Sequence, residues 1–278
     1  MFCILLIIQF MPSLAWATAQ LDPEALTILE TLKKTTQTIQ SYRVTQTLYE
    51  RFGEKMGELT TIDLKYDNST IYFHVLDSAE KGAEAIYSPL SNWVWAHQGH
   101  FPDITIPLNI YSRFLVSSKH HPINEAGFSY LVNTTLRNID VMKQFDEGEL
   151  SLQHHTTADG RIEHIIEMKM PVRTFNYQLE PSDTSFSIAK KFNSSAYWIL
   201  HVNHLHSHHA LKTSALIRIP SYYAQRVIFT IDAQTHQLSQ ADYFDQSDQL
   251  YERYTWRDFK EQVFTHDDFD RKNKKYHF

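Results

Sequence analysis

The feature that most constrains the fold is an alternation of apolar and polar residues in three consecutive segments, 42–52, 61–66 and 70–77. Short polar stretches, GEKMGE and Asp67-Asn68, separate them. A period of two places successive side chains on opposite faces of a strand, so the pattern predicts an antiparallel meander with one buried face. With two shorter strands expected at 84–87 and 93–97, the inward set is predicted to be Val44, Leu48, Ile62, Leu64, Ile71, Phe73, Val75, Trp93 and Trp95.

Two amphipathic segments accompany the strand pattern, one before it and one within it. The first, 23–40, has leucines at helical spacing, with Asp22 as the N-cap and Pro23 as the first helical residue. The second, NEAGFSYLVNTTLRNIDVMKQF (124–145), also reads as a helix. Strands are expected again at 149–156 and 161–171, and in three segments between 226 and 259. About ten strands joined by short turns predict an α+β fold, in which one curved antiparallel sheet carries the two helices.

The N-terminal segment MFCILLIIQFMPSLAWATAQ predicts a secretory signal peptide over residues 1–19. Its apolar run is too short for a membrane-spanning helix, and it precedes two overlapping A-x-A patterns that predict cleavage near Ala17 or Ala19. The alternative is a buried N-terminal strand. The only cysteine, Cys3, lies in this segment, so the mature chain would contain no thiol. A single exported domain over 20–278, in the periplasm, is therefore expected, with no integral membrane segment left after cleavage.

The charge and the motifs argue against several classes of function. A net charge of −6, with no basic patch, argues against nucleic acid. The sequence contains no G-x-S-x-G, H-E-x-x-H or glycine-rich phosphate loop, and has only 7 glycines. We therefore predict a protein that is not an enzyme and has no cofactor.

The most conspicuous local feature is HVNHLHSHHA (201–210), which contains five histidines. It lies in a segment, 174–222, that shows no regular period and is expected to be irregular. Neutral imidazoles are good ligands for Zn²⁺ or Cu²⁺, and a helix would place two of them one turn apart. The alternative is an exposed polar loop, because no acidic residue lies nearby to support a metal site. The candidate metal ligands are His201, His204, His206 and His208.

Several segments together resemble a bacterial family of exported proteins of unknown function. They are KGAEAIY (81–87), HHPINEAGF (120–128) and LYERYTWRDFK (250–260), followed by DDFDRKNKKYHF (267–278). This family is similar to the LolA and LolB lipoprotein carriers. The resemblance implies an incompletely closed half-barrel with helices across an apolar concave face.

A curved sheet with an unfilled concave face can hold an acyl chain. The leading hypothesis is a non-enzymatic periplasmic protein that binds a lipid, an acyl chain or a lipidated peptide in envelope lipid or lipoprotein handling. The alternatives are an envelope interaction or sensor module that binds a protein partner without ligand, and a histidine-based metal binder. The inward set would instead form a closed core if the helices fill the concave face.

Overall fold

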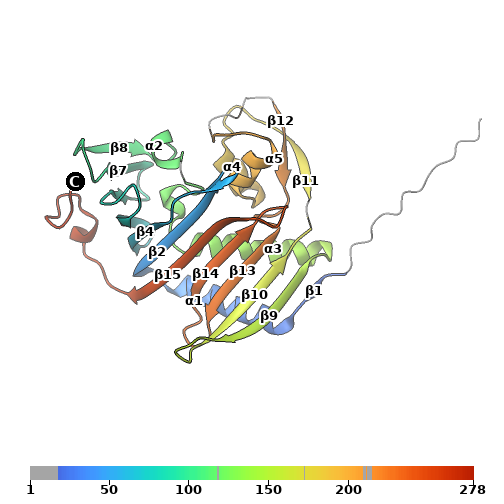
Figure 1. Ribbon diagram of the computed structural model, residues 1–278. Coiled ribbons are helices and arrows are strands. Elements are labelled where there is room, and N and C mark those ends of the chain that lie inside the picture. Colours follow the sequence, from blue (N-terminus) through green and yellow to red (C-terminus); the bar gives the residue numbers. More distant parts are fainter. Residues whose placement is uncertain (1–17, 118, 172, 209–210, 212–214) are drawn as a thin grey trace, which may run out of the picture.

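The computed structural model describes residues 18–117, 119–171, 173–208, 211 and 215–278. Residues 1–17 of the predicted signal peptide lie outside this range. The main sheet has the strand order β1-β9-β10-β13-β14-β15-β2-β4-β5-β6-β7-β8, and its two end strands do not meet. It is antiparallel except for the short parallel pair β1–β9. The predicted class, α+β with an open curved sheet, is confirmed (Figure 1).

The strands of this sheet have the following bounds: β1 Gln20–Leu21, β2 Ser41–Phe52, β3 Lys55–Met56 (paired only with β2), β4 Thr60–Asp67, β5 Thr70–Asp77, β6 Glu84–Tyr87, β7 Trp93–His97, β8 Thr105–Asn109, β9 Glu149–Thr156, β10 Ile162–Lys169, β13 Arg226–Asp232, β14 Leu238–Phe244 and β15 Leu250–Glu261. In the sheet β15 pairs with β2, so the last strand of the chain joins the two meanders.

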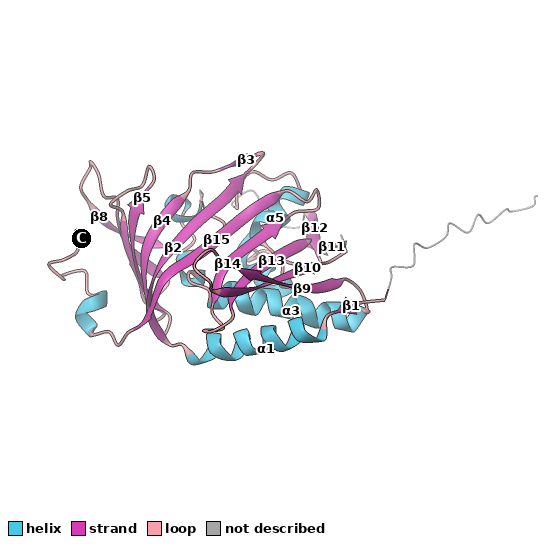
Figure 2. Cartoon of the chain, turned by 60° about the horizontal axis from the view of Figure 1, so that its bottom comes forward, coloured by secondary structure: helices cyan, strands magenta, loops and turns pink. Residues whose placement is uncertain are grey.

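Two helices cover part of one face of the sheet. Helix α1 (Pro23–Thr38) begins at Asp22, whose side chain accepts hydrogen bonds from two backbone N–H groups of the first turn. Helix α3 (Ser129–Phe145) packs against α1, and both lie under β9, β10 and β13 in Figure 2. Both predicted helices are confirmed. The second starts later than expected because Gly127 has φ +89°, outside the helical region, and only a 3-10 turn, η1 (Ile123–Glu125), precedes it.

The segment 174–222 is not irregular, which corrects the prediction. It forms the hairpin of β11 (Thr174–Gln178) and β12 (Leu216–Pro220), with α4 (Ser185–Phe192) and α5 (Ala196–Val202) between them. These elements bury their own apolar cluster, which also includes Val116 from α2 (Arg113–Val116). The helices are too short to show a clear period, and the strands pair across about forty residues, so local patterns did not reveal them.

The C-terminal segment packs on the opposite face of the β4–β8 end of the sheet. It includes the 3-10 helix η2 (His266–Phe269). The ring of Tyr276 stacks on Tyr72 with centroids 4.2 Å apart, and the His277 ring nitrogen Nδ1 lies 2.7 Å from Glu84 Oε1. The end of the chain therefore meets KGAEAIY, so two of the segments that carried the family resemblance are in contact. Within the described ranges, no helix is both long and apolar enough to cross a membrane.

Candidate functional site

A cavity of about 390 Å³ lies between the β2–β8 half of the sheet and the chain that crosses it. That crossing chain comprises α2, residues 119–127 and the start of α3. The other half of the same face is filled by α1 and α3. The apolar part of the lining consists of Leu48, Ile62, Phe73, Val75, Ala83, Ala85, Ala96, Ile104, Ile106, Leu108, Phe114, Leu115, Pro122, Ile123, Ala126 and Leu131. The concave face is thus partly a closed core and partly an apolar cavity.

The predicted wall residues divide into three groups. Leu48, Ile62, Phe73 and Val75 line the cavity. Val44, Leu64 and Ile71 lie on the same face but are completely buried in the main core. The alternation therefore identified the right face of β2, β4 and β5, but not which part of that face helices cover.

Trp93 and Trp95 do not belong to the wall, which corrects the prediction. In the register of β7, Val94 pairs with Tyr87 and Ala96 pairs with Ala85, so Val94 and Ala96 face the concave side. Trp93 is 54% exposed on the other face. Trp95 lies under the Arg271 guanidinium, which is 3.9 Å from the ring centroid. The C-terminal segment covers this face. The sequence alone does not distinguish a tryptophan under such a segment from a tryptophan in the core.

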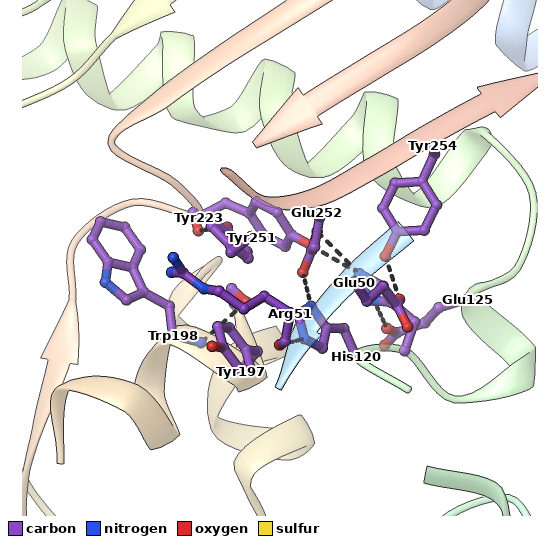
Figure 3. A network of polar contacts seen from close by, with 12 residues as sticks. Glu50, Arg51, His120, Glu125, Tyr197, Trp198, Tyr223, Tyr251, Glu252 and Tyr254 are labelled. Atoms are coloured by element: carbon purple, nitrogen blue, oxygen red, sulfur yellow. Dashed lines mark hydrogen bonds and ion pairs between the residues drawn. The ribbon is translucent and has the colours of Figure 1, made fainter. Parts of the chain in front are cut away.

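The crossing chain (α2, residues 119–127 and the start of α3) forms the roof of the cavity. A buried charged network holds this roof in place (Figure 3). Its centre is Glu252 on β15, a completely buried carboxylate. The His120 Nδ1 donates to Glu252 Oε1 at 2.7 Å, and its Nε2 donates to the Arg51 backbone carbonyl at 2.7 Å. Because both partners only accept, both ring nitrogens carry a proton, and His120 is a cation. The Tyr197 ring of α5 stacks on it with centroids 4.1 Å apart.

The neighbouring residue, His121, binds a second carboxylate. Its Nδ1 lies 2.8 Å from Glu125 Oε2, and its Nε2 lies 2.8 Å from the Tyr223 hydroxyl. That hydroxyl donates to Glu252 Oε2 at 2.6 Å, so it accepts from His121. Burial lowers the pKa of His121, but hydrogen bonds and charge from Glu125 and Glu252 outweigh it and raise the pKa to about 10.

The same balance applies to Glu252. Burial would raise its pKa, but the hydrogen bonds and charges of His120 and His121 lower the pKa to about 2. The network therefore pairs the cations His120 and His121 with the anions Glu252 and Glu125. Both His121 and Glu125 line the cavity. The network ties residues 120–125 to β15 and so fixes the position of the roof.

Sequence reasoning did not identify this network as a site. His120 and Glu252 are 132 positions apart, and no spacing rule joins them. The family resemblance was the one indication of these residues. It rests on HHPINEAGF, which begins with His120 and His121, and on LYERYTWRDFK, which contains Glu252. The structure brings these two segments together.

The four candidate metal ligands are not brought together. His204 and His206 are exposed, and His201 lies in the last turn of α5. His208 stacks on Phe186 at 4.3 Å, and its Nδ1 lies 2.8 Å from Ser185 Oγ. Within the described ranges, no three of their ring nitrogens lie within 4.8 Å of one another. The only group that meets this distance there is His266, Asp267 and Asp270, on the C-terminal segment.

The sequence matches one protein family over more than half of its length. The family described as "Protein of unknown function (DUF1571)" matches residues 39–193, so the chain belongs to that family. The resemblance to a family of unknown function is thereby confirmed. The match includes KGAEAIY and HHPINEAGF but ends before LYERYTWRDFK. No curated protein matches the sequence.

Several solved structures are similar at low identity. LprF from Mycobacterium bovis is 12% identical, with 88% of this chain and 97% of that chain covered and a TM-score of 0.43. An uncharacterized conserved protein from Thermus thermophilus is 7% identical, with 91% and 96% covered and a TM-score of 0.42. A LolA superfamily protein from Nitrosomonas europaea is 12% identical, with 88% and 97% covered and a TM-score of 0.33.

Proposed function

We propose that this DUF1571 protein is a non-enzymatic carrier that binds a lipid, an acyl chain or a lipidated peptide and works in the periplasm on envelope lipids or lipoproteins. The observation that carries the proposal is the apolar cavity of about 390 Å³ on the concave face. Its size lies within the usual range of about 300–1,000 Å³ for small-molecule sites, which are mostly apolar with a few polar groups.

The mouth of the cavity supports exchange of an apolar ligand. Three lining residues near the edge of the sheet are partly or largely exposed: Phe114 of α2 is 84% exposed, and Ile104 and Ile106 beside and on β8 are 50% and 38% exposed. Exposed apolar side chains around a cavity are unfavourable in water unless a partner covers them. These side chains offer an apolar chain a path into the cavity.

The charged groups of the lining fit a positioning role. His121 is paired with Glu125, and Lys119 Nζ lies 3.2 Å from Glu80 Oε2. Ion pairs of this kind hold the roof and the rim in place. We therefore propose that the protein acts by binding and release and not by catalysis. The cavity lining favours this carrier over the alternative of an interaction module without ligand.

Native mass spectrometry of protein purified without detergent tests the proposal. We expect a population with extra mass that corresponds to a bound lipid or acyl-bearing molecule. We also expect the purified protein, after extraction of that molecule, to bind a fluorescent acyl probe in a saturable manner. A protein that carries no extra mass and binds no acyl probe would contradict the proposed function.

Filling the cavity should abolish binding of the probe. Ala96 is half-buried on β7 and lines the cavity, so Ala96→Phe places a ring inside it. We expect the affinity for the acyl probe to fall about tenfold or more, or ~1.4 kcal/mol, because the added ring occupies space that the chain needs. Fluorescence titration measures this.

The matched control is Ala79→Phe, which adds the same side chain at an exposed position outside the lining. It should leave the affinity unchanged. Equal affinities of the two variants would show that the probe binds elsewhere.

A further inference from the structure

One residue on the floor of the cavity is not explained by its apolar surroundings. Gln46, in the middle of β2, lines the cavity and is 3% exposed. Its Oε1 has no hydrogen-bond partner in the part of the chain that the structure describes. A buried acceptor without a partner costs about 1–3 kcal/mol, so a protein that needed only an apolar floor would be more stable with leucine here.

Gln46 belongs to a polar ring around Leu48. Gln46 and Glu50 flank Leu48 on the same face of β2. The two residues that pair with Leu48 across the neighbouring strands are Thr60 of β4 and Tyr254 of β15. All five residues line the cavity. The floor therefore presents one leucine surrounded by an amide, a carboxylate and two hydroxyl groups.

The ring contains donors as well, in the Gln46 NH₂ group and the Thr60 hydroxyl, but Gln46 Oε1 is its one buried polar side-chain atom without a partner in the described ranges. The Tyr254 hydroxyl donates to Glu50 Oε1 at 2.6 Å, so its proton is already used (Figure 3). The unpartnered Gln46 Oε1 and the buried Glu50 carboxylate remain to accept. A ligand group that donates O–H or N–H would satisfy Gln46. A carboxylate or phosphate would bring a second negative charge near the buried Glu50, which is unfavourable.

We propose that this ring is a subsite that selects, among apolar ligands, those with an O–H or N–H donor and no negative charge at their buried end. The inference rests on the proposed function, because it assumes that the cavity holds an apolar chain. It adds the orientation of the ligand, whose polar donor points to β2, and the class of head group that the floor accepts.

The test compares two probes of equal chain length, dodecanol and dodecanoate, by their displacement of the fluorescent acyl probe. In the unmodified protein dodecanol should displace the probe at about tenfold lower concentration than dodecanoate. In Gln46→Leu we expect dodecanol to bind about threefold to tenfold more weakly, the effect of one hydrogen bond to a neutral group, while dodecanoate is unchanged.

Two controls separate selection from folding. Thr47→Val changes the next residue of β2, whose side chain is on the other face, and should leave both affinities unchanged. The ligand-free Gln46→Leu protein should unfold at the same or a higher urea concentration, because it loses an unpaired buried acceptor. Gln46→Met gives the same comparison if leucine does not fold.

The outcomes distinguish the two proposals. If neither chain displaces the probe and the probe itself does not bind, the proposed function fails and this inference fails with it. If both chains bind but dodecanol has no advantage, or if the advantage survives Gln46→Leu and Gln46→Met, only the subsite is overturned.

Discussion

Glu252→Gln should lower the free energy of unfolding by about 3–5 kcal/mol, because it removes the anion that the buried His120 and the partly buried His121 face. Glu252 accepts hydrogen bonds from His120 Nδ1 and from the Tyr223 hydroxyl. A glutamine can offer one oxygen, but its NH₂ group would meet donors at the other position. The variant also leaves His120 buried without a counter-charge. Urea unfolding followed by tryptophan fluorescence measures the loss.

The control lies on the same strand. Glu261 at the end of β15 is exposed, and Glu261→Gln should change the unfolding free energy by no more than about 0.5 kcal/mol. A loss below about 1 kcal/mol in Glu252→Gln would mean that the network adjusts its protonation without cost. The roof over the cavity would then not depend on Glu252, and its position would have to come from apolar packing alone.

The fold was largely predictable because its strands obey a local rule. Val44, Leu64 and Ile71 alternate with polar residues, and they are completely buried as that rule requires. The start of α1 was also predictable, since a carboxylate at Asp22 followed by Pro23 is a local signal. Where the pattern was long and periodic, the prediction and the structure agree.

The candidate site was predictable only in part. Leu48, Ile62, Phe73 and Val75 line the cavity because they share a face with the core, yet sequence alone could not say that helices stop short of them. The face of Trp93 and Trp95 was predicted wrongly. Bulky aromatic residues look like core, but Arg271, from a segment far along the chain, covers Trp95 on the opposite face.

The β11–β12 hairpin with its helices α4 and α5, and the charged network around Glu252, could not be predicted for a different reason. Both depend on contacts between distant segments, such as the stacking of Tyr197 in α5 on His120. The histidine cluster drew attention because its residues are close in sequence. The ion-paired histidines of the network, the buried His120 and the partly buried His121, lie in the segment HHPINEAGF, which contains only these two histidines.

The stability of the protein should depend on pH in two directions, and both follow from the network. The pKa of Glu252 is lowered to about 2, so its contribution is fully present above its ordinary value of 4.5 and is lost as the pH falls toward 2. The pKa of His121 is raised to about 10, so its contribution is fully present below 6.5 and is lost as the pH rises toward 10. The network is therefore expected to stabilise the fold most between about pH 4.5 and 6.5.

The alkaline decline is the sharper test, because few other groups lose protons in that range. The groups that face His121 are Glu125, Glu252 and the tyrosines 130, 223 and 254, and burial raises the pKa of all three tyrosines. These phenols therefore stay protonated while His121 loses its proton.

We expect the free energy of unfolding, measured by urea titration, to fall by several kcal/mol between about pH 6.5 and 9.5. In His121→Phe the protein should be less stable at pH 6.5, and this part of the decline should disappear.

If the decline were the same in both proteins, His121 would be neutral in the fold, and Glu125 would have to be held by another donor. The cavity roof would then be tied to β15 through His120 alone.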